Sequence, residues 1–209
     1  MEKHIKTVDE QILSCIFGNK RGWVFTPGHF KHLGSRDSIA SALKRHKQSG
    51  LIRQLARGLY DYPKTDPDLG TLEPSTDDIA KALAGRDATR LQPSGAYAAN
   101  LLGLSNQVPM KVVYLTDGRS RTVQIGKRQI TLKNTTPRNM ATANKTSGLV
   151  IQALRHIGKD QVNQEVIVKL RKRLATEDRK RLMADIRYAP EWIAEIFRKL
   201  AQEEWERIR

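Results

Sequence analysis

One stretch, residues 35–63, constrains the fold of this chain most, because a basic helix there runs directly into a short hairpin. Ser35 is well placed to cap that helix and Gly50 to end it. Helical spacing predicts that its buried face is formed by Ile39, Ala42, Leu43 and His46. Two strand-like runs, residues 51–55 and 59–62, follow on either side of Ala56-Arg57-Gly58. The stretch therefore predicts a helix followed by a two-stranded wing.

The residues before this stretch complete a recognisable order of elements. From Thr7 onward, apolar residues recur at helical spacing, which predicts a helix that ends near Gly18. A short apolar run over residues 23–25 precedes Thr26-Pro27, a typical start for a short second helix over residues 28–33. Helix, short helix, turn, basic helix and hairpin is the order of a winged helix-turn-helix. We expect that fold in residues 1–66.

Such a fold reads DNA with the exposed face of its basic helix and with its wing. The candidate contacts are therefore polar and basic residues of these two elements: Arg36, Ser38, Ser41, Lys44, Arg45, Arg53 and Arg57. Two alternatives stay open, since basic helix faces are often only solvated and winged helices also bind proteins. Asp37 and Asp61 oppose DNA binding locally. Across the chain, 37 Lys and Arg against 22 Asp and Glu give a net charge of +15, which favours a nucleic acid or another polyanion as partner. Together with the order of elements, this charge leads us to expect double-stranded DNA.

The second part of the chain predicts a mixed architecture. Residues 62–74 are rich in Pro, Gly and Asp, which indicates a linker or boundary loop, and we place the domain boundary between residues 66 and 67. Helices are expected over residues 75–83 and 93–102, then a three-stranded antiparallel meander over residues 110–132. Helical spacing takes over from Thr146. The expected fold class is α+β, with residues 67–209 forming a domain with a small antiparallel sheet and a helical C-terminal part.

Several chemistries find no support in the sequence. The single cysteine, Cys15, excludes an intramolecular disulfide and a Cys-rich zinc site, and we interpret His29 and His32 as structural or surface residues rather than metal ligands. No phosphate-binding glycine loop and no acidic cluster on strand ends is present in the sequence, so we predict no cofactor, no metal and no enzymatic activity. A signal core and long apolar runs are lacking too, which favours a cytoplasmic protein that does not enter a membrane.

Basic residues also gather around the predicted meander. The four arginines that we select are Arg90, Arg119, Arg121 and Arg128. Side chains on one polar face of a sheet could form a basic surface for phosphate or an RNA-like ligand. The alternative is an ordinary solvated sheet face.

Four segments of the sequence resemble a known family. The run LQPSGAYAANLLGLSNQVPMKVVYLTDGRSRTVQIGKRQITLKN, residues 91–134, is similar to the second domain of AbiEi-type antitoxins of bacterial type IV toxin-antitoxin systems. The wing ending RGLYDYP, residues 57–63, resembles the same family, as do LRHIGKD at 154–160 and APEWIAEI at 189–196. The resemblance covers nearly the whole chain, although some members have longer second domains.

The resemblance implies a transcriptional autorepressor that binds operator inverted repeats, and so lies on the nucleoid when bound. It also implies a second domain that counters a nucleotidyltransferase-like toxin without forming a stable complex. The basic active surface of the family would fall on Arg90, Arg119, Arg121 and Arg128. A different class of function stays open: an accessory regulator of a mobile element, whose second domain binds a ligand or mediates assembly.

Overall fold

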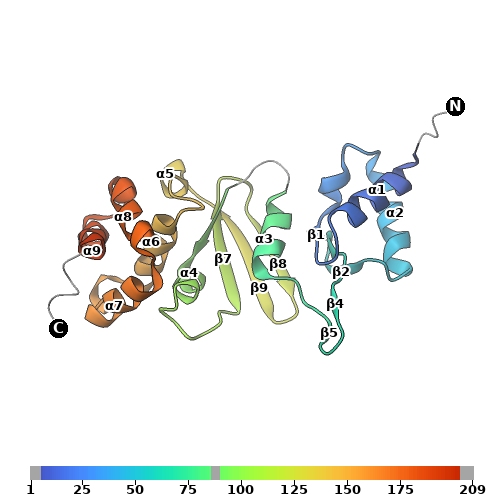
Figure 1. Cartoon of the computed structure of the whole chain (residues 1–209). Helices are drawn as coiled ribbons and strands as arrows, with labels where there is room; N and C mark the ends of the chain where they lie inside the picture. Colours follow the sequence, from blue (N-terminus) through green and yellow to red (C-terminus); the bar gives the residue numbers. More distant parts are fainter. Residues whose placement is uncertain (1–5, 86–89, 203–209) are drawn as a thin grey trace. The chain divides into compact units, whose positions relative to one another are not determined.

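The computed structural model describes residues 6–85 and 90–202 and has an α+β fold, as expected (Figure 1). It divides into two compact units. The first contains residues 1–89 together with the short segment 123–126, and the second contains residues 90–122 and 127–209. Each unit has its own hydrophobic core.

The first unit contains two longer helices and a small sheet. Its elements to residue 61 are α1 (Val8–Gly18), β1 (Val24–Phe25), the 3₁₀ helix η1 (Pro27–Phe30), α2 (Arg36–Gln48), β2 (Arg53–Ala56) and β3 (Leu59–Asp61). The strands pair antiparallel in the order β1-β3-β2. The short second helix was predicted over residues 28–33, but it is a single 3₁₀ turn. Its start is fixed by His29, whose Nδ1 accepts the backbone N–H of Thr26 at 3.1 Å.

Local signals explain where the helices of this unit begin and end. Thr7 and Glu10 form a reciprocal capping box at the start of α1. Ser35 Oγ accepts the backbone N–H of Ser38 at 3.2 Å, as predicted for the cap of α2. Gly50 follows α2 with a φ of +75°, a left-handed conformation that favours glycine. The apolar faces of these elements meet in one buried core that includes Ile12, Ile16, Phe25, Phe30, Ile39, Ala42, Leu43 and Ile52.

The segment after β3 is attached to the first unit. Instead of a plain linker, residues 62–74 hold a second small hairpin, β4 (Thr65–Asp66) with β5 (Gly70–Thr71). Helix α3 (Thr76–Ala84) follows, capped by Ser75, and it packs beside β1. The expected boundary between residues 66 and 67 therefore does not coincide with the division between the compact units, which falls after residue 89.

The second unit contains a mixed four-stranded sheet, of which residues 123–125 in one edge strand are grouped with the first unit. Its elements are β6 (Leu91–Ser94), α4 (Gly95–Leu101), β7 (Lys111–Thr116), β8 (Arg121–Ile125) and β9 (Arg128–Asn134). The strand order is β6-β7-β9-β8, in which β6 and β7 are antiparallel whereas β7 and β9 are parallel. Strand β6 was not predicted: residues 93 and 94, expected to begin a helix over residues 93–102, end this strand instead, and α4 begins at Gly95. Here β6 is an edge strand, where proline is tolerated.

The antiparallel meander predicted for residues 110–132 is wrong. The chain turns at Gly126-Lys127 between β8 and β9, but Asp117-Gly118 is a bend and not a hairpin turn, because β9 rather than β8 lies beside β7. The physical reason is burial: Ile130 and Leu132 of β9 are fully buried, while Arg121, Thr122 and Gln124 of β8 are exposed. The apolar strand takes the interior position and the polar strand takes the edge, which water can reach.

Helices make up the rest of the second unit, as the spacing after Thr146 predicts. They are α5 (Pro137–Met140), α6 (Thr146–Ile157), η2 (Lys159–Gln161), α7 (Gln164–Arg173), α8 (Thr176–Leu182), η3 (Met183–Tyr188) and α9 (Glu191–Ala201). Their apolar faces form a core with Val150, Leu154, Leu170, Leu182 and Phe197. Within the described residues, no helix combines the length and apolar character that crossing a membrane requires.

Candidate nucleic-acid interface

The exposed face of α2 carries a continuous polar stripe. Asp37, Ser41, Lys44 and Gln48 follow one another at spacings of four, three and four residues, and all four are exposed. This spacing places them on one side of a helix. The predicted inward residues Ile39, Ala42, Leu43 and His46 are buried on the opposite side, which confirms that part of the prediction. Arg36 is exposed at the first helical position.

Two of the predicted contacts lie outside this stripe, on the flank of α2. Ser38 helps to cap the helix, because its Oγ donates to the carbonyl of Ser35 at 2.9 Å. Arg45 reaches α1, where its Nη2 lies 2.7 Å from Asp9 Oδ1. The side chain of Arg45 is still 59% exposed, so this ion pair is of the weak, solvated kind. His46 Nε2 lies 3.2 Å from the same Asp9 oxygen.

The hairpin of β2 and β3 presents Arg57 at its tip. Arg57 is exposed, and Gly58 beside it has a φ of +72°, which allows the tight turn. Lys47 of α2 donates to Gln54 Oε1 of β2 at 2.7 Å and so ties the helix to the hairpin. An open cavity of about 620 Å³ lies here, and its lining includes Lys47, Gln54, Arg57 and Thr71. The cavity is therefore lined by one basic side chain from the end of α2 and one from the tip of the hairpin.

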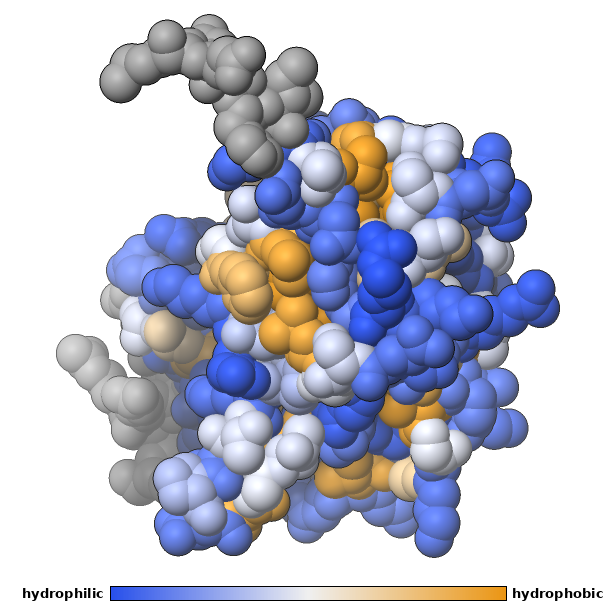
Figure 2. All heavy atoms as spheres, turned by 90° about the vertical axis from the view of Figure 1, so that its right-hand side faces the viewer, coloured by the Kyte–Doolittle hydropathy of each residue, from blue (hydrophilic) through white to orange (hydrophobic). Residues whose placement is uncertain are grey.

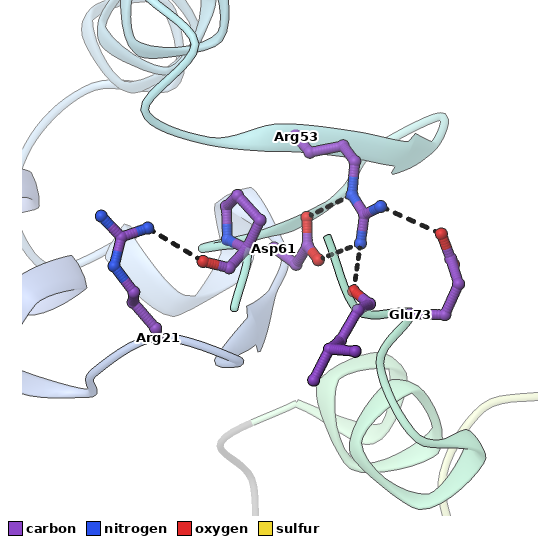
Figure 3. Close-up of polar contacts among 6 residues, drawn as sticks. Arg21, Arg53, Asp61 and Glu73 are labelled. Atoms are coloured by element: carbon purple, nitrogen blue, oxygen red, sulfur yellow. Dashed lines mark hydrogen bonds and ion pairs between the residues drawn. The ribbon is translucent and has the colours of Figure 1, made fainter. Parts of the chain in front are cut away.

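Arg53 has a different environment from the other predicted contacts (Figure 3). Its Nε and Nη2 donate to the two carboxylate oxygens of Asp61 at 3.2 and 2.7 Å. The same guanidinium donates to the carbonyl of Leu72 at 3.0 Å and to Glu73 Oε1 at 2.9 Å. Hydrogen bonding to Asp61 raises the pKa of Arg53, so the group stays charged. We therefore assign Arg53 to the scaffold of the first unit and leave it out of the proposed interface.

The Arg53 network also removes one of the two local objections to DNA binding. Asp61 is only 1% exposed, and its charge is neutralised by Arg53. Asp37 remains exposed on the polar stripe of α2. Close to the network, Arg21 donates to the carbonyl of Pro63 at 3.0 Å, and its guanidinium lies 4.7 Å from the ring centre of Tyr62.

Hydrophilic residues dominate the face of the molecule seen in Figure 2, with smaller hydrophobic patches between them. The exposed cations of α2 and its hairpin are Arg36, Lys44, Arg45, Lys47 and Arg57. Protein surfaces that bind DNA are more polar and more basic than those that bind protein. The position of these five cations on two neighbouring elements is therefore suited to a polyanion.

The four arginines selected in the second part of the chain do not form one cluster. Arg90, Arg119 and Arg121 lie near the end of β7 at Thr116, since Leu91 pairs with that residue. Arg128 starts β9 at the opposite end, where Gln129 pairs with Lys111. The six residues of β7 separate the two ends by about 20 Å.

Arg90 is held in place by neighbouring groups. Its backbone N–H and Nε donate to the two carboxylate oxygens of Asp117, at 2.9 and 2.8 Å, and its Nη1 donates to the carbonyl of Met140. The hydrogen bond from the Arg90 side chain lowers the pKa of Asp117. The predicted basic surface is thus divided between the two ends of the strands, and Arg90 is paired with Asp117.

The residues considered for metal binding and catalysis belong to the first unit. His29 Nδ1 lies at hydrogen-bond distance from groups of Thr26, and the ring of His29 meets Trp23 edge-on. Cys15 is a half-buried thiol of α1. Over residues 6–85 and 90–202, no three His, Cys, Asp or Glu side chains gather where they could hold a metal ion.

A comparison with protein-family models matches residues 11–182 to a family of unknown function, DUF6088. The match covers most of both units. A search of the curated proteins gives no match.

Proposed function

The chain belongs to the DUF6088 family, whose function is unknown, and we propose from its geometry that it is a DNA-binding transcriptional autorepressor. In this proposal the first unit is a winged helix-turn-helix. Helix α2 is its recognition helix and the β2–β3 hairpin is its wing. The observation that carries the proposal is the exposed polar stripe of α2 with a basic hairpin tip beside it.

The dimensions of α2 suit the major groove of DNA. With 13 residues the helix is about 20 Å long, and B-form DNA has a major groove about 12 Å wide that admits one helix. Arg36, Ser41, Lys44 and Gln48 would face the base edges or the phosphates beside them. Asp37 on the same stripe can accept a hydrogen bond from the amino group of cytosine, so its charge is compatible with base reading.

The remaining basic residues would contact the DNA backbone. Arg57 at the hairpin tip and Lys47 at the end of α2 are placed to neutralise phosphates. Arg45 can join them by leaving Asp9, because an exposed ion pair is worth only about 0–1 kcal/mol. The hydroxyl of Ser38 would stay bonded to the cap residue Ser35 rather than contact a base.

We further propose that the protein is the antitoxin of a type IV toxin-antitoxin system. This part rests on the resemblance of residues 91–134 to AbiEi-type antitoxins, and it needs no catalysis, cofactor or metal. Two copies would bind operator inverted repeats. The second unit would counter a nucleotidyltransferase-like toxin without a stable complex, with Arg119 and Arg121 at the more basic end of the sheet.

Repression is tested with a reporter gene placed behind the DNA that lies upstream of this chain's own gene. The full-length protein should lower reporter expression. With Lys44→Gln, expression should be about tenfold higher than with the unmodified protein, as expected for loss of one charge-assisted contact. Lys159→Gln is the matched control, since it removes the same charge from an exposed position of η2. No repression by the unmodified protein, or equal relief by both variants, would contradict the proposal.

Antitoxin activity is tested by co-expression with a nucleotidyltransferase-like toxin encoded beside the gene. The protein should restore growth, and Lys44→Gln should restore it equally, because DNA reading and toxin neutralisation would lie in different units. Simultaneous loss of repression and rescue in this variant would refute that division.

A second candidate function is an accessory regulator whose second unit binds a small ligand. The observation that favours it is a cavity of about 270 Å³ among the helices α7, α8 and α9 of that unit.

A further inference from the structure

The open cavity of about 620 Å³ beside the wing is lined by two parts of the first unit (Figure 1). One part is the end of α2 with the β2–β3 hairpin, and the other is the segment after β3 that holds β4 and β5. The lining includes Lys47, Gln54, Ala56, Arg57, Pro63 and Thr71. We propose that the sugar-phosphate backbone of one DNA strand lies in this cavity, so that the β4–β5 hairpin is part of the DNA interface. The inference rests on the proposed function and extends it to a segment whose composition indicated a linker.

The first argument is the charge of the lining. Lys47 and Arg57 are exposed, and within the described residues neither is paired with a carboxylate, since Lys47 donates to the neutral side chain of Gln54. No carboxylate belongs to the described lining. The cavity therefore keeps two positive charges for a polyanion.

The carboxylates that are near in sequence do not cancel this charge. Asp61 and Glu73 accept hydrogen bonds from Arg53, which also lines the cavity. Asp66 Oδ1 accepts two backbone N–H groups of the turn that follows it, at 2.9 and 3.0 Å. Asp68 lies in that turn, at the tip of the β4–β5 hairpin. None of these four carboxylates is part of the described lining.

The second argument is that the β4–β5 hairpin is fixed beside the wing. The guanidinium of Arg53 donates to the carbonyl of Leu72, directly after β5, at 3.0 Å. Leu72 in turn donates its backbone N–H to the carbonyl of Lys64, directly before β4, at 2.9 Å. Thr71 pairs with Thr65 across the hairpin. Because this part of the lining is already ordered, DNA binding does not have to order it.

The third argument is the match between the open cavity and an extended ligand. Pockets for small molecules bury about 70–90% of the ligand surface, which an open cavity does not provide. A polymer backbone can cross such a cavity and continue on both sides. Thr71 and Gln54 are exposed, and hydroxyl and amide side chains commonly contact phosphates and sugars. Ala56 and Pro63 add apolar surface that suits the deoxyribose.

Opposite charges at Thr71 test the inference. Thr71→Lys adds a cation to the lining, so it should tighten binding of the full-length protein to the upstream DNA and steepen the slope of log affinity against log salt by about one. Thr71→Glu places a carboxylate beside the phosphates and should weaken binding about tenfold or more. Fluorescence anisotropy from about 50 to about 200 mM salt measures both changes. A folding defect would weaken binding in both variants, so changes of opposite sign exclude it.

Thr122→Lys and Thr122→Glu are the matched controls. Thr122 is also an exposed threonine in a strand, but it belongs to β8 and does not line this cavity. The control variants change the net charge equally and should alter affinity less than about twofold, because salt screens charges that do not lie beside the DNA. Since backbone contacts carry no sequence information, the Thr71 variants should change affinity for the upstream DNA and for a scrambled duplex alike.

The possible results separate this inference from the proposed function. The inference is overturned if the two Thr71 variants change affinity in the same direction, or by no more than the Thr122 variants do. Equal binding of the unmodified protein to both duplexes would contradict the proposed repressor, while the Thr71 comparison would still decide this inference. Absence of any DNA binding would overturn both.

Discussion

The guanidinium of Arg53 holds three parts of the first unit together: strand β2, strand β3 and the segment before α3. Asp61, its main partner, is buried, so its negative charge depends on Arg53 for compensation. Breaking such a pair from one side leaves a buried charge, which costs more than the pair itself contributes. Arg53 therefore has a structural role in the first unit, and we do not expect it to contact DNA.

We predict that Arg53→Met lowers the free energy of unfolding by about 2–4 kcal/mol, because Asp61 then stays buried without its cation. Urea unfolding followed by circular dichroism measures the change. Arg57→Met at the hairpin tip is the control, and an exposed site of this kind should change stability by less than about 0.5 kcal/mol. Similar effects of the two variants would mean that Asp61 does not depend on Arg53.

The sequence held a signal for this pair. Arg53 and Asp61 lie symmetrically about Arg57, and residues placed so in a hairpin face each other across its strands, as their pairing shows. Reading Arg53 by its charge alone predicted a DNA contact. Reading it together with its cross-strand neighbour predicts an ion pair.

A second buried carboxylate predicts pH dependence in the second unit. Asp185 is buried, which raises its pKa, but hydrogen bonds from Lys145 at 2.8 Å and Ser147 at 2.6 Å outweigh burial, so the pKa is lowered overall. A carboxylate whose pKa is lowered by folding stabilises the folded protein at pH values above its unfolded pKa of about 4. This contribution is lost as the pH falls below that value. Asp185→Asn should therefore be less stable than the unmodified protein at pH 6.

Urea unfolding of both proteins from pH 6 to about pH 3 measures this contribution. The stability difference between them should shrink as the pH falls below about 4. A difference that stays constant over this range would show that the carboxylate charge is not what stabilises the site.

At the scale of the element, helical spacing predicts the buried face of α2, but it does not predict which exposed residues of α2 bond to neighbouring groups. The inward residues followed from periodicity, because apolar side chains four and three residues apart must share a face. Periodicity alone did not separate Ser38 and Arg45 from Ser41 and Lys44. That separation depends on α1, which supplies Asp9 to one flank of α2, and on the helix cap at Ser35.

This division predicts unequal effects on DNA binding. Lys44→Gln should weaken binding to the upstream DNA by about 1–3 kcal/mol, since Lys44 lies in the exposed stripe. Arg45→Gln should have a smaller effect, because its guanidinium is shared with Asp9 in the unbound protein. Fluorescence anisotropy with labelled DNA measures both losses. A larger loss for Arg45→Gln would indicate that the flank toward α1, rather than the stripe, faces the DNA.

The sheet of the second unit was only partly predictable. The turn at Gly126-Lys127 was predictable because turn chemistry is local, whereas the hairpin expected at Asp117-Gly118 is only a bend, since β7 and β8 do not pair. The order of its strands could not be predicted locally, because that order depends on which strand buries more apolar surface against residues distant in the sequence. The burial of Ile130 and Leu132 decides that order here.

At the scale of the whole molecule, the chain combines a net charge of +15 with a division into two compact units. Charge alone supports non-specific binding to any nucleic acid, which weakens steeply with salt. Sequence-specific binding requires side chains at base edges as well. The two origins of affinity can therefore be separated by varying the DNA sequence and the salt concentration together.

The position of the unit boundary could not be read from composition. Residues 62–74 have the composition of a linker, yet Arg53 bonds to Leu72 and Glu73 and fixes this segment on the first unit. The four arginines of the second part also looked alike in sequence. Strand register places Arg128 at the opposite end from the other three, and register is not visible in composition.

The most direct test of the account is the affinity of the full-length protein for its own upstream DNA and for a scrambled duplex, measured from about 50 to about 200 mM salt. A specific repressor should prefer the upstream DNA by about a thousandfold near physiological salt, and Lys44→Gln should reduce that preference. Equal affinity for both duplexes, fading together as salt rises, would show that the positive charge binds DNA without reading it and would contradict the proposed function.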